Sequence, residues 1–148
     1  MSDDVARAVT LVETTIRALG VDPASAKIPG DDKTYAYALR RGSARVVVAI
    51  SHGHGGHGVL RVLAPVVRAP EASKEAAVFR RLLEINAREI SGAAFGLFGD
   101  EVVVVVERPT KDLDASEVEA NVKNVGRVAD HWDDALAIEV GLLRPTDV

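Results

Sequence analysis

Residues 95–132 constrain the fold of this chain most, because they predict a tight hairpin followed directly by a long amphipathic helix. Two β-rich runs, 95–98 and 102–106, flank Gly99 and Asp100. This dipeptide suits the positive-φ positions of a two-residue hairpin turn. The two runs therefore predict adjacent antiparallel strands, and the helix that follows must cover the sheet to which they belong.

The start of that helix is also well marked. Asp114 can cap the first turn, and Glu117 stands at the spacing that completes a capping box. Leu113 and Val118 occupy the two positions of a hydrophobic staple. Apolar residues then recur at steps of three and four, which predicts one buried stripe, made of Val118, Val122, Val125, Ala129, Trp132 and Leu136.

The rest of the chain alternates between helical and strand patterns. Helices are predicted at 2–19 and 70–90, and three further strands at 33–40, 45–51 and 59–67. Pro65 has no N–H to give to a ladder, so we expect an edge position or a β-bulge there. The predicted fold is α+β, with an antiparallel five-stranded sheet and three helices in the order α-β-β-β-α-β-β-α, and residues 1–148 are expected to form a single domain.

Composition excludes several classes of function. At 148 residues, with 47% hydrophobic residues, the chain can bury a core without disulfides or metal, and no apolar run is long enough to span a membrane. A net charge of -4 argues against nucleic-acid binding as the main activity. The chain has no Cys and an acidic start without a signal-peptide pattern, so we expect a cytoplasmic protein.

The helix predicted at 70–90 is apolar over an arc of roughly 200°, wider than an ordinary surface helix requires. Such an arc predicts burial on two sides. One interpretation is a central core helix crossed by two neighbours, and the other is a homodimer interface with some polar pairing at its centre. The residues of that interface would be Val78, Phe79, Leu82, Leu83, Ile85 and Asn86.

Two strands, 102–106 and 46–50, lack the alternation of polar and apolar residues that a half-solvated strand shows. Both faces of these two strands are therefore expected to be covered. A partner subunit or bound segment would do so, and so would long side chains wrapped around a central strand. For a partner-binding surface we expect contributions from Tyr35, Tyr37, Val103 and Val105.

The loop 52–58, here the histidine loop, is rich in Gly and His. It matches a dinucleotide-binding fingerprint in form, but the next segment predicts a strand rather than the required helix, so nucleotide binding is rejected. His52, His54 and His57 could hold a zinc-class or copper-class ion. A solvated turn without metal is the simpler interpretation, because the loop supplies no partner that would fix each imidazole.

No catalytic constellation stands out. Ser51 beside His52 lacks the strand-to-helix elbow of a nucleophile, and His131 lies among aspartates on the solvated side of its helix. We therefore expect no enzymatic activity and no cofactor.

The element order, the segment 82–86, the hairpin at 95–98 and the pair Leu113–Asp114 together resemble the YbjN family, which is similar to type III secretion chaperones of the Tir-chaperone class. The resemblance covers nearly the whole chain as a pattern of hydrophobic spacing. It implies a small acidic homodimer without catalytic residues, whose second helix contributes to the dimer interface. It also implies that apolar grooves hold an extended client segment.

Together these features predict a non-enzymatic protein-binding module, chaperone-like or regulatory, that acts as a homodimer and binds a partner polypeptide. The alternative is a metal-binding or metal-sensing protein that uses the histidine loop.

Overall fold

The structure, a computed structural model that describes residues 2–142, is built on one six-stranded antiparallel sheet in the order β1-β2-β3-β4-β6-β5. The strands are β1 (Lys27–Ile28), β2 (Thr34–Arg41), β3 (Ala44–His52), β4 (Gly58–Arg68), β5 (Ala94–Phe98) and β6 (Glu101–Pro109). The helices are α1 (Asp3–Ala18), α2 (Pro23–Ala26), α3 (Glu75–Arg88) and α4 (Ala115–Val140), with 3-10 turns η1 (His54–Gly56) and η2 (Ala72–Lys74).

The predicted α+β fold and its element order are confirmed, with two short additions. Asp22 caps α2 with Pro23 at its first position, and the two residues of β1 then pair with the middle of β2. Both elements lie between residues 19 and 33, where the sequence predicts neither a helix nor a strand. They are short enough that no periodicity marks them.

Helix α4 forms as its sequence predicts. The side chain of Asp114 accepts from the backbone N–H of Glu117 at 2.9 Å, and the side chain of Glu117 accepts from the Asp114 N–H at 3.0 Å. Leu113 and Val118 are both fully buried, and all six residues of the predicted stripe are buried. The helix ends at Gly141, whose φ of 68° is the left-handed conformation that glycine adopts readily.

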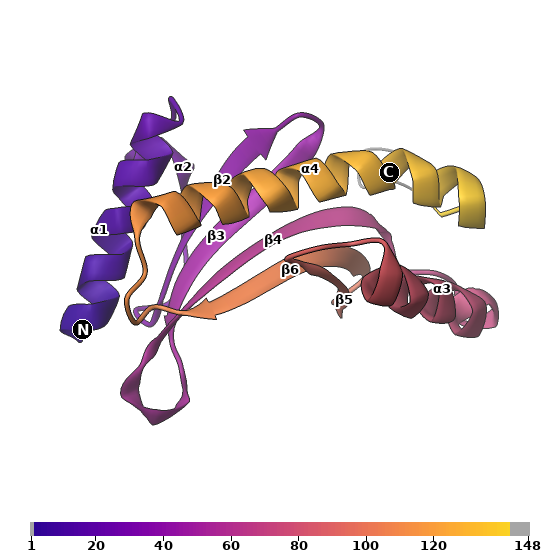
Figure 1. The fold of residues 1–148 in the computed structure, drawn as a ribbon, viewed down its shortest axis with the longest axis horizontal. Helices are drawn as coiled ribbons and strands as arrows, with labels where there is room; N and C mark the ends of the chain where they lie inside the picture. Colours follow the sequence, from indigo (N-terminus) through magenta and orange to yellow (C-terminus); the bar gives the residue numbers. More distant parts are fainter. Residues whose placement is uncertain (1, 143–148) are drawn as a thin grey trace.

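Helices α1 and α4 cover one face of the sheet (Figure 1). Val46 of β3 points toward Gly126 of α4, because a Cβ atom added to Gly126 would lie 3.5 Å from Cγ2 of Val46. The alternate residues of β3 that share this face are buried. The side chains on the opposite face are mostly only partly buried, so this second face, here the open face, remains accessible to solvent.

The predicted irregularity at Pro65 is a β-bulge on a central strand. The register between β4 and β6 shifts between Pro65 and Val67. On the other side, pairing of β3 with β4 ends at Val47 and Leu63, two residues before the proline. Pro65 therefore lies where β4 no longer pairs with β3, so its missing N–H interrupts no ladder bond to that strand.

Candidate polypeptide-binding surfaces

Helix α3 buries one stripe, made of Val78, Leu82 and Ile85, and leaves Leu83 67% exposed. The helix lies at one end of the sheet, beside β5, and is shorter than the predicted 70–90 because residues 72–74 form a 3-10 turn (Figure 1). Within one copy of the chain, α3 is therefore not a core helix enclosed on two sides. The rest of its apolar arc is available for contact with another molecule.

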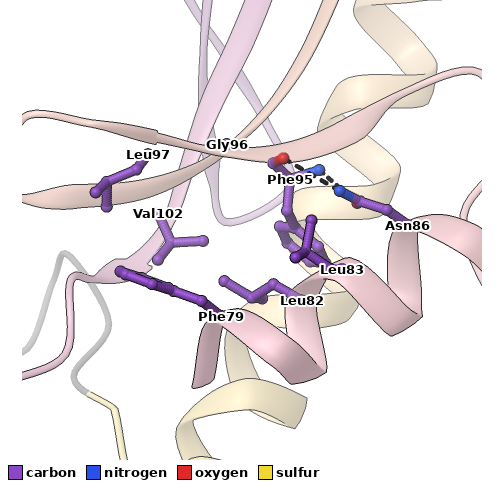
Figure 2. A pocket seen from close by; sticks show the side chains of 8 residues that line it. All are labelled: Phe79, Leu82, Leu83, Asn86, Phe95, Gly96, Leu97 and Val102. Carbon is purple, nitrogen blue, oxygen red and sulfur yellow. Dashed lines mark hydrogen bonds between the residues drawn. The ribbon is translucent and has the colours of Figure 1, made fainter. Parts of the chain in front are cut away.

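An apolar groove separates α3 from β5. It encloses a cavity of about 190 Å³ and contains no charged side chain (Figure 2). This groove, here the α3–β5 groove, is lined by Phe79, Leu82, Leu83, Asn86, Phe95, Gly96, Leu97 and Val102. Of the six residues predicted for the dimer interface, four line this groove, whereas Val78 and Ile85 are buried beneath it.

The side-chain amide of Asn86 forms two hydrogen bonds within the chain. Its amide Nδ2 donates to the carbonyl of Phe95 at 3.2 Å, and its Oδ1 accepts from the Phe95 N–H at 2.7 Å (Figure 2). The side-chain amide thus satisfies both backbone groups of an edge-strand residue, as a neighbouring strand would. The Phe95 ring packs edge-on against Trp132 of α4, with 6.1 Å between ring centroids. Asn86 was predicted to lie in a dimer interface; its amide joins α3 to β5, and its place in an interface stays a prediction.

The charged residues of α3 lie outside the lining of the α3–β5 groove. Arg81 donates to Glu139 of α4 at 2.5 Å and to Glu89 at 2.8 Å. These hydrogen bonds, first that to Glu139 and then that to Glu89, raise the pKa of the Arg81 guanidinium. On the outer side of α3, Arg80 pairs with Glu84 at 3.2 Å.

Exposed large apolar side chains concentrate near this groove. Among the described residues, four are strongly exposed, and three of them, Leu83, Leu97 and Phe98, come from α3 and β5. The fourth, Ile138, lies near the end of α4 and is 85% exposed. Clustering of this kind marks an interaction site more strongly than single exposed residues do.

The four residues predicted to bind a partner do not lie together. Tyr35 and Tyr37 pair in register with Ile50 and Val48, which belong to the helix-covered face. Tyr37 is 1% exposed, and its hydroxyl donates to Glu13 of α1 at 2.6 Å. Burial, and then this contact with Glu13, raise the pKa of the Tyr37 hydroxyl. Its side chain is therefore part of the core and inaccessible to a partner.

Val103 and Val105 lie on the open face, opposite Pro65 and Leu63 of β4. Val105 is partly exposed, whereas Val103 is 4% exposed. Of the four predicted residues, Val105 is therefore the one that the structure presents on the open face.

The histidine loop is a tight turn in which the N–H of Gly53 donates to the carbonyl of His57 at 2.6 Å. Strand β4 follows it directly, which agrees with the rejection of nucleotide binding. Among the side chains that the structure describes, which do not include His54, no group of three His, Cys, Asp or Glu could hold a metal ion. The predicted site at His52, His54 and His57 therefore gains no support and stays a prediction.

The aspartates near His131 hold the β2–β3 hairpin. The backbone N–H of Ser43, in the turn, donates to Asp130 at 2.9 Å, and its hydroxyl contacts both Asp130 and Asp133. The hydroxyl contact, followed by the backbone one, lowers the pKa of the Asp130 carboxyl. No local sequence pattern predicts this contact, because Ser43 and Asp130 are 87 residues apart.

Residues 6–142 match the family described as type III secretion system (YopN, CesT) and YbjN peptide-binding chaperone 1. The chain belongs to this family. The peptide-binding chaperones of this family are not enzymes, in agreement with the prediction of no catalytic activity.

Two solved structures share the fold of this chain. A chain of the HopA1–SchA chaperone–effector complex is 12% identical, with a TM-score of 0.60, and the match covers 90% of this chain and 98% of that chain. A chain of the ExsC–ExsE complex is 18% identical, with a TM-score of 0.63 and coverage of 89% and 95%. No curated protein matches the sequence. In the described part of the chain, no helix is long and apolar enough to cross a membrane.

Proposed function

We propose that this member of the peptide-binding chaperone family acts as a homodimer that binds a partner polypeptide, without catalysis. The family to which it belongs is one of peptide-binding chaperones, and one structure of the same fold is a chaperone–effector complex. The observation that carries the homodimer is the uncharged α3–β5 groove with the exposed Leu83 on its edge.

The occupant proposed for the α3–β5 groove is a second copy of the chain. Most homodimers have two-fold symmetry, in which a residue that enters a site on the partner is matched by the reciprocal contact. Such an interface needs a protruding group and a hollow next to each other on the same surface. Leu83 and the cavity beside it meet this requirement, because Leu83 is 67% exposed and the cavity is lined by Phe79, Phe95 and Leu97.

The polar groups of α3 are compatible with the same arrangement. Arg81 is already paired with Glu89 and Glu139, so closing the interface around these groups leaves no unpaired charge from this trio. Asn86, the one polar side chain in the groove lining, has both of its amide atoms bonded to Phe95. Covering the groove therefore removes apolar surface from water with little loss of polar hydration.

Sedimentation velocity over a wide range of protein concentration tests this proposal. We expect a dimer for the unmodified chain and a folded monomer for Leu83→Arg, because the guanidinium would have to enter an uncharged cavity. Ile138→Arg is the matched control, since it places the same charge at an exposed leucine-sized side chain of α4 that does not line the groove. A monomeric unmodified chain, or a dimer that Leu83→Arg leaves intact, would contradict the proposed interface.

A further inference from the structure

Strand β5 forms one edge of the sheet and lacks the charges and prolines that commonly protect such an edge. It pairs only with β6, and its five residues, Ala94–Phe98, include neither a charged side chain nor a proline. Its last two side chains, Leu97 and Phe98, are strongly exposed. An exposed apolar edge strand is a template on which another strand can pair.

The strand at the opposite edge has these protections. Strand β1 is two residues long, contains Lys27 and is followed directly by Pro29. Short length, lysine and proline each discourage the addition of a further strand. Because β5 is longer and has neither lysine nor proline, its edge requires a different kind of protection.

Asn86 occupies the edge of β5. Its two hydrogen bonds use both the N–H and the carbonyl of Phe95, so these backbone groups point away from β6 (Figure 2). Backbone groups alternate in direction along a strand, so those of Leu97 also point outward, whereas those of Gly96 point toward β6. The carboxamide therefore blocks one of the two positions of β5 at which another strand could form hydrogen bonds.

A second copy of β5 would need the position that Asn86 blocks. Two copies related by a two-fold axis run antiparallel, and the register that overlaps the whole strand places Phe95 of each copy opposite Leu97 of the other. Gly96 of each copy then lies opposite its counterpart, at the axis. Each hydrogen bond of this pairing would use the N–H or the carbonyl of Phe95, and Asn86 already holds both groups in each copy.

We propose that Asn86 caps the β5 edge and prevents two copies of the chain from joining their sheets, so that copies meet through the side chains of the α3–β5 groove. This inference rests on the proposed homodimer and specifies how its two chains contact each other. Without the cap, pairing of the two β5 strands would make one continuous sheet. The side chain at position 86 therefore selects between two modes of self-association.

Disulfide formation between copies tests the inference, because the chain has no native Cys. Directly opposite residues of a non-hydrogen-bonded pair have Cα atoms about 4.5 Å apart, within the range that a disulfide spans. Gly96→Cys therefore reports the joined sheets. A Cβ atom at position 96 would make only ordinary contacts, at 3.7 Å from Cγ1 of Val105 and 3.9 Å from Cγ2 of Val103.

The rate of disulfide formation is measured with oxidised glutathione at equal protein concentrations. We expect a slow reaction for Gly96→Cys and a rate at least about thirtyfold higher for Asn86→Ala/Gly96→Cys, because pairing no longer breaks the two hydrogen bonds of Asn86. Asn86→Asp/Gly96→Cys should lie between them. Its ionised carboxylate can accept from the Phe95 N–H but has no proton to donate to the Phe95 carbonyl.

A proline at position 97 locates the contact. Leu97→Pro removes an outward-pointing N–H and leaves the pairing with β6 intact, which an edge strand tolerates. Added to Asn86→Ala/Gly96→Cys, it should return the rate to that of Gly96→Cys alone. Leu97→Ala is the matched control, because it removes the same side chain but keeps the N–H, and the reaction should stay fast.

The failures of the two proposals are distinguishable. If Gly96→Cys forms the disulfide equally fast with and without Asn86, or if Leu97→Pro and Leu97→Ala behave alike, the inference is overturned, whatever sedimentation shows. A monomeric unmodified chain overturns the proposed homodimer, whereas the cap is tested in variants whose β5 edge is open. Circular dichroism checks the folding of each variant, and Asn86→Asp supplies the comparison if Asn86→Ala does not fold.

Discussion

Replacing Asn86 by Ala removes the two hydrogen bonds that join α3 to β5. The bonds measure 3.2 and 2.7 Å and satisfy both backbone groups of Phe95. A net contribution of about 1 kcal/mol for each bond predicts a loss of about 2 kcal/mol in the free energy of unfolding. For a chain of this size, that loss corresponds to a decrease of about 4–8 °C in Tm.

The assay is urea unfolding followed by circular dichroism, with every variant at the same protein concentration because association would shift the apparent stability. Asn124→Ala is the matched control. Its amide also makes two hydrogen bonds, donating to the carbonyl of Ser91 at 3.0 Å and accepting from Arg127 at 2.7 Å, but both are exposed to solvent, so we expect a loss of less than about 1 kcal/mol. If Asn86→Ala lowers stability no more than Asn124→Ala does, the reasoning that this amide holds the edge of the sheet is refuted.

Three further predictions concern other parts of the molecule. Gly126→Ala should destabilise the protein by about 1–3 kcal/mol in urea unfolding, although alanine favours helices, because the new Cβ would lie 2.7 Å from the Cβ of Arg41; a stabilised variant would contradict this packing. Hydrogen bonds from the Ser116 hydroxyl and then the Glu117 N–H lower the pKa of the Asp114 carboxyl, so its contribution to stability is present above its unfolded pKa and is lost as pH falls through its folded pKa. Asp114→Ala should therefore destabilise the protein at pH 7, and its difference from the unmodified chain should shrink in acid; a pH-independent difference in urea midpoint would contradict this. If the histidine loop binds zinc, nickel or copper ions, calorimetry should detect heat that weakens as pH falls through the imidazole range, and no heat at pH 7.5 would end that alternative.

The features that the sequence predicted well depend on near neighbours in the chain. The capping box of Asp114 and Glu117 spans three residues, and the hairpin turn at Gly99 and Asp100 needs only the two runs on either side of it. The stripe of α4 follows from helical periodicity alone. These local signals, together with the element order, were sufficient to predict the fold class.

The features that were missed depend on contacts between distant parts of the chain. Asn86 was predicted to lie in a dimer interface. Its hydrogen bonds to Phe95 could not be predicted without knowing that Phe95 lies at a sheet edge beside α3. The sequence shows that Tyr35 and Tyr37 lie on the same face of their strand, but it does not show which face α1 covers. Because α1 covers the face that carries Tyr37, this side chain is buried and contacts Glu13.

The most direct test of the account is the rate of thiol labelling in two single-cysteine variants, Leu83→Cys and Ile138→Cys, which is clean because the chain has no native Cys. Both positions are strongly exposed, but only Leu83 lines the α3–β5 groove. Raising the protein concentration should slow labelling at position 83 alone, because a second copy covers the groove. If labelling at position 83 does not depend on concentration, or if labelling at position 138 slows equally, the assignment of the groove to a second copy is wrong.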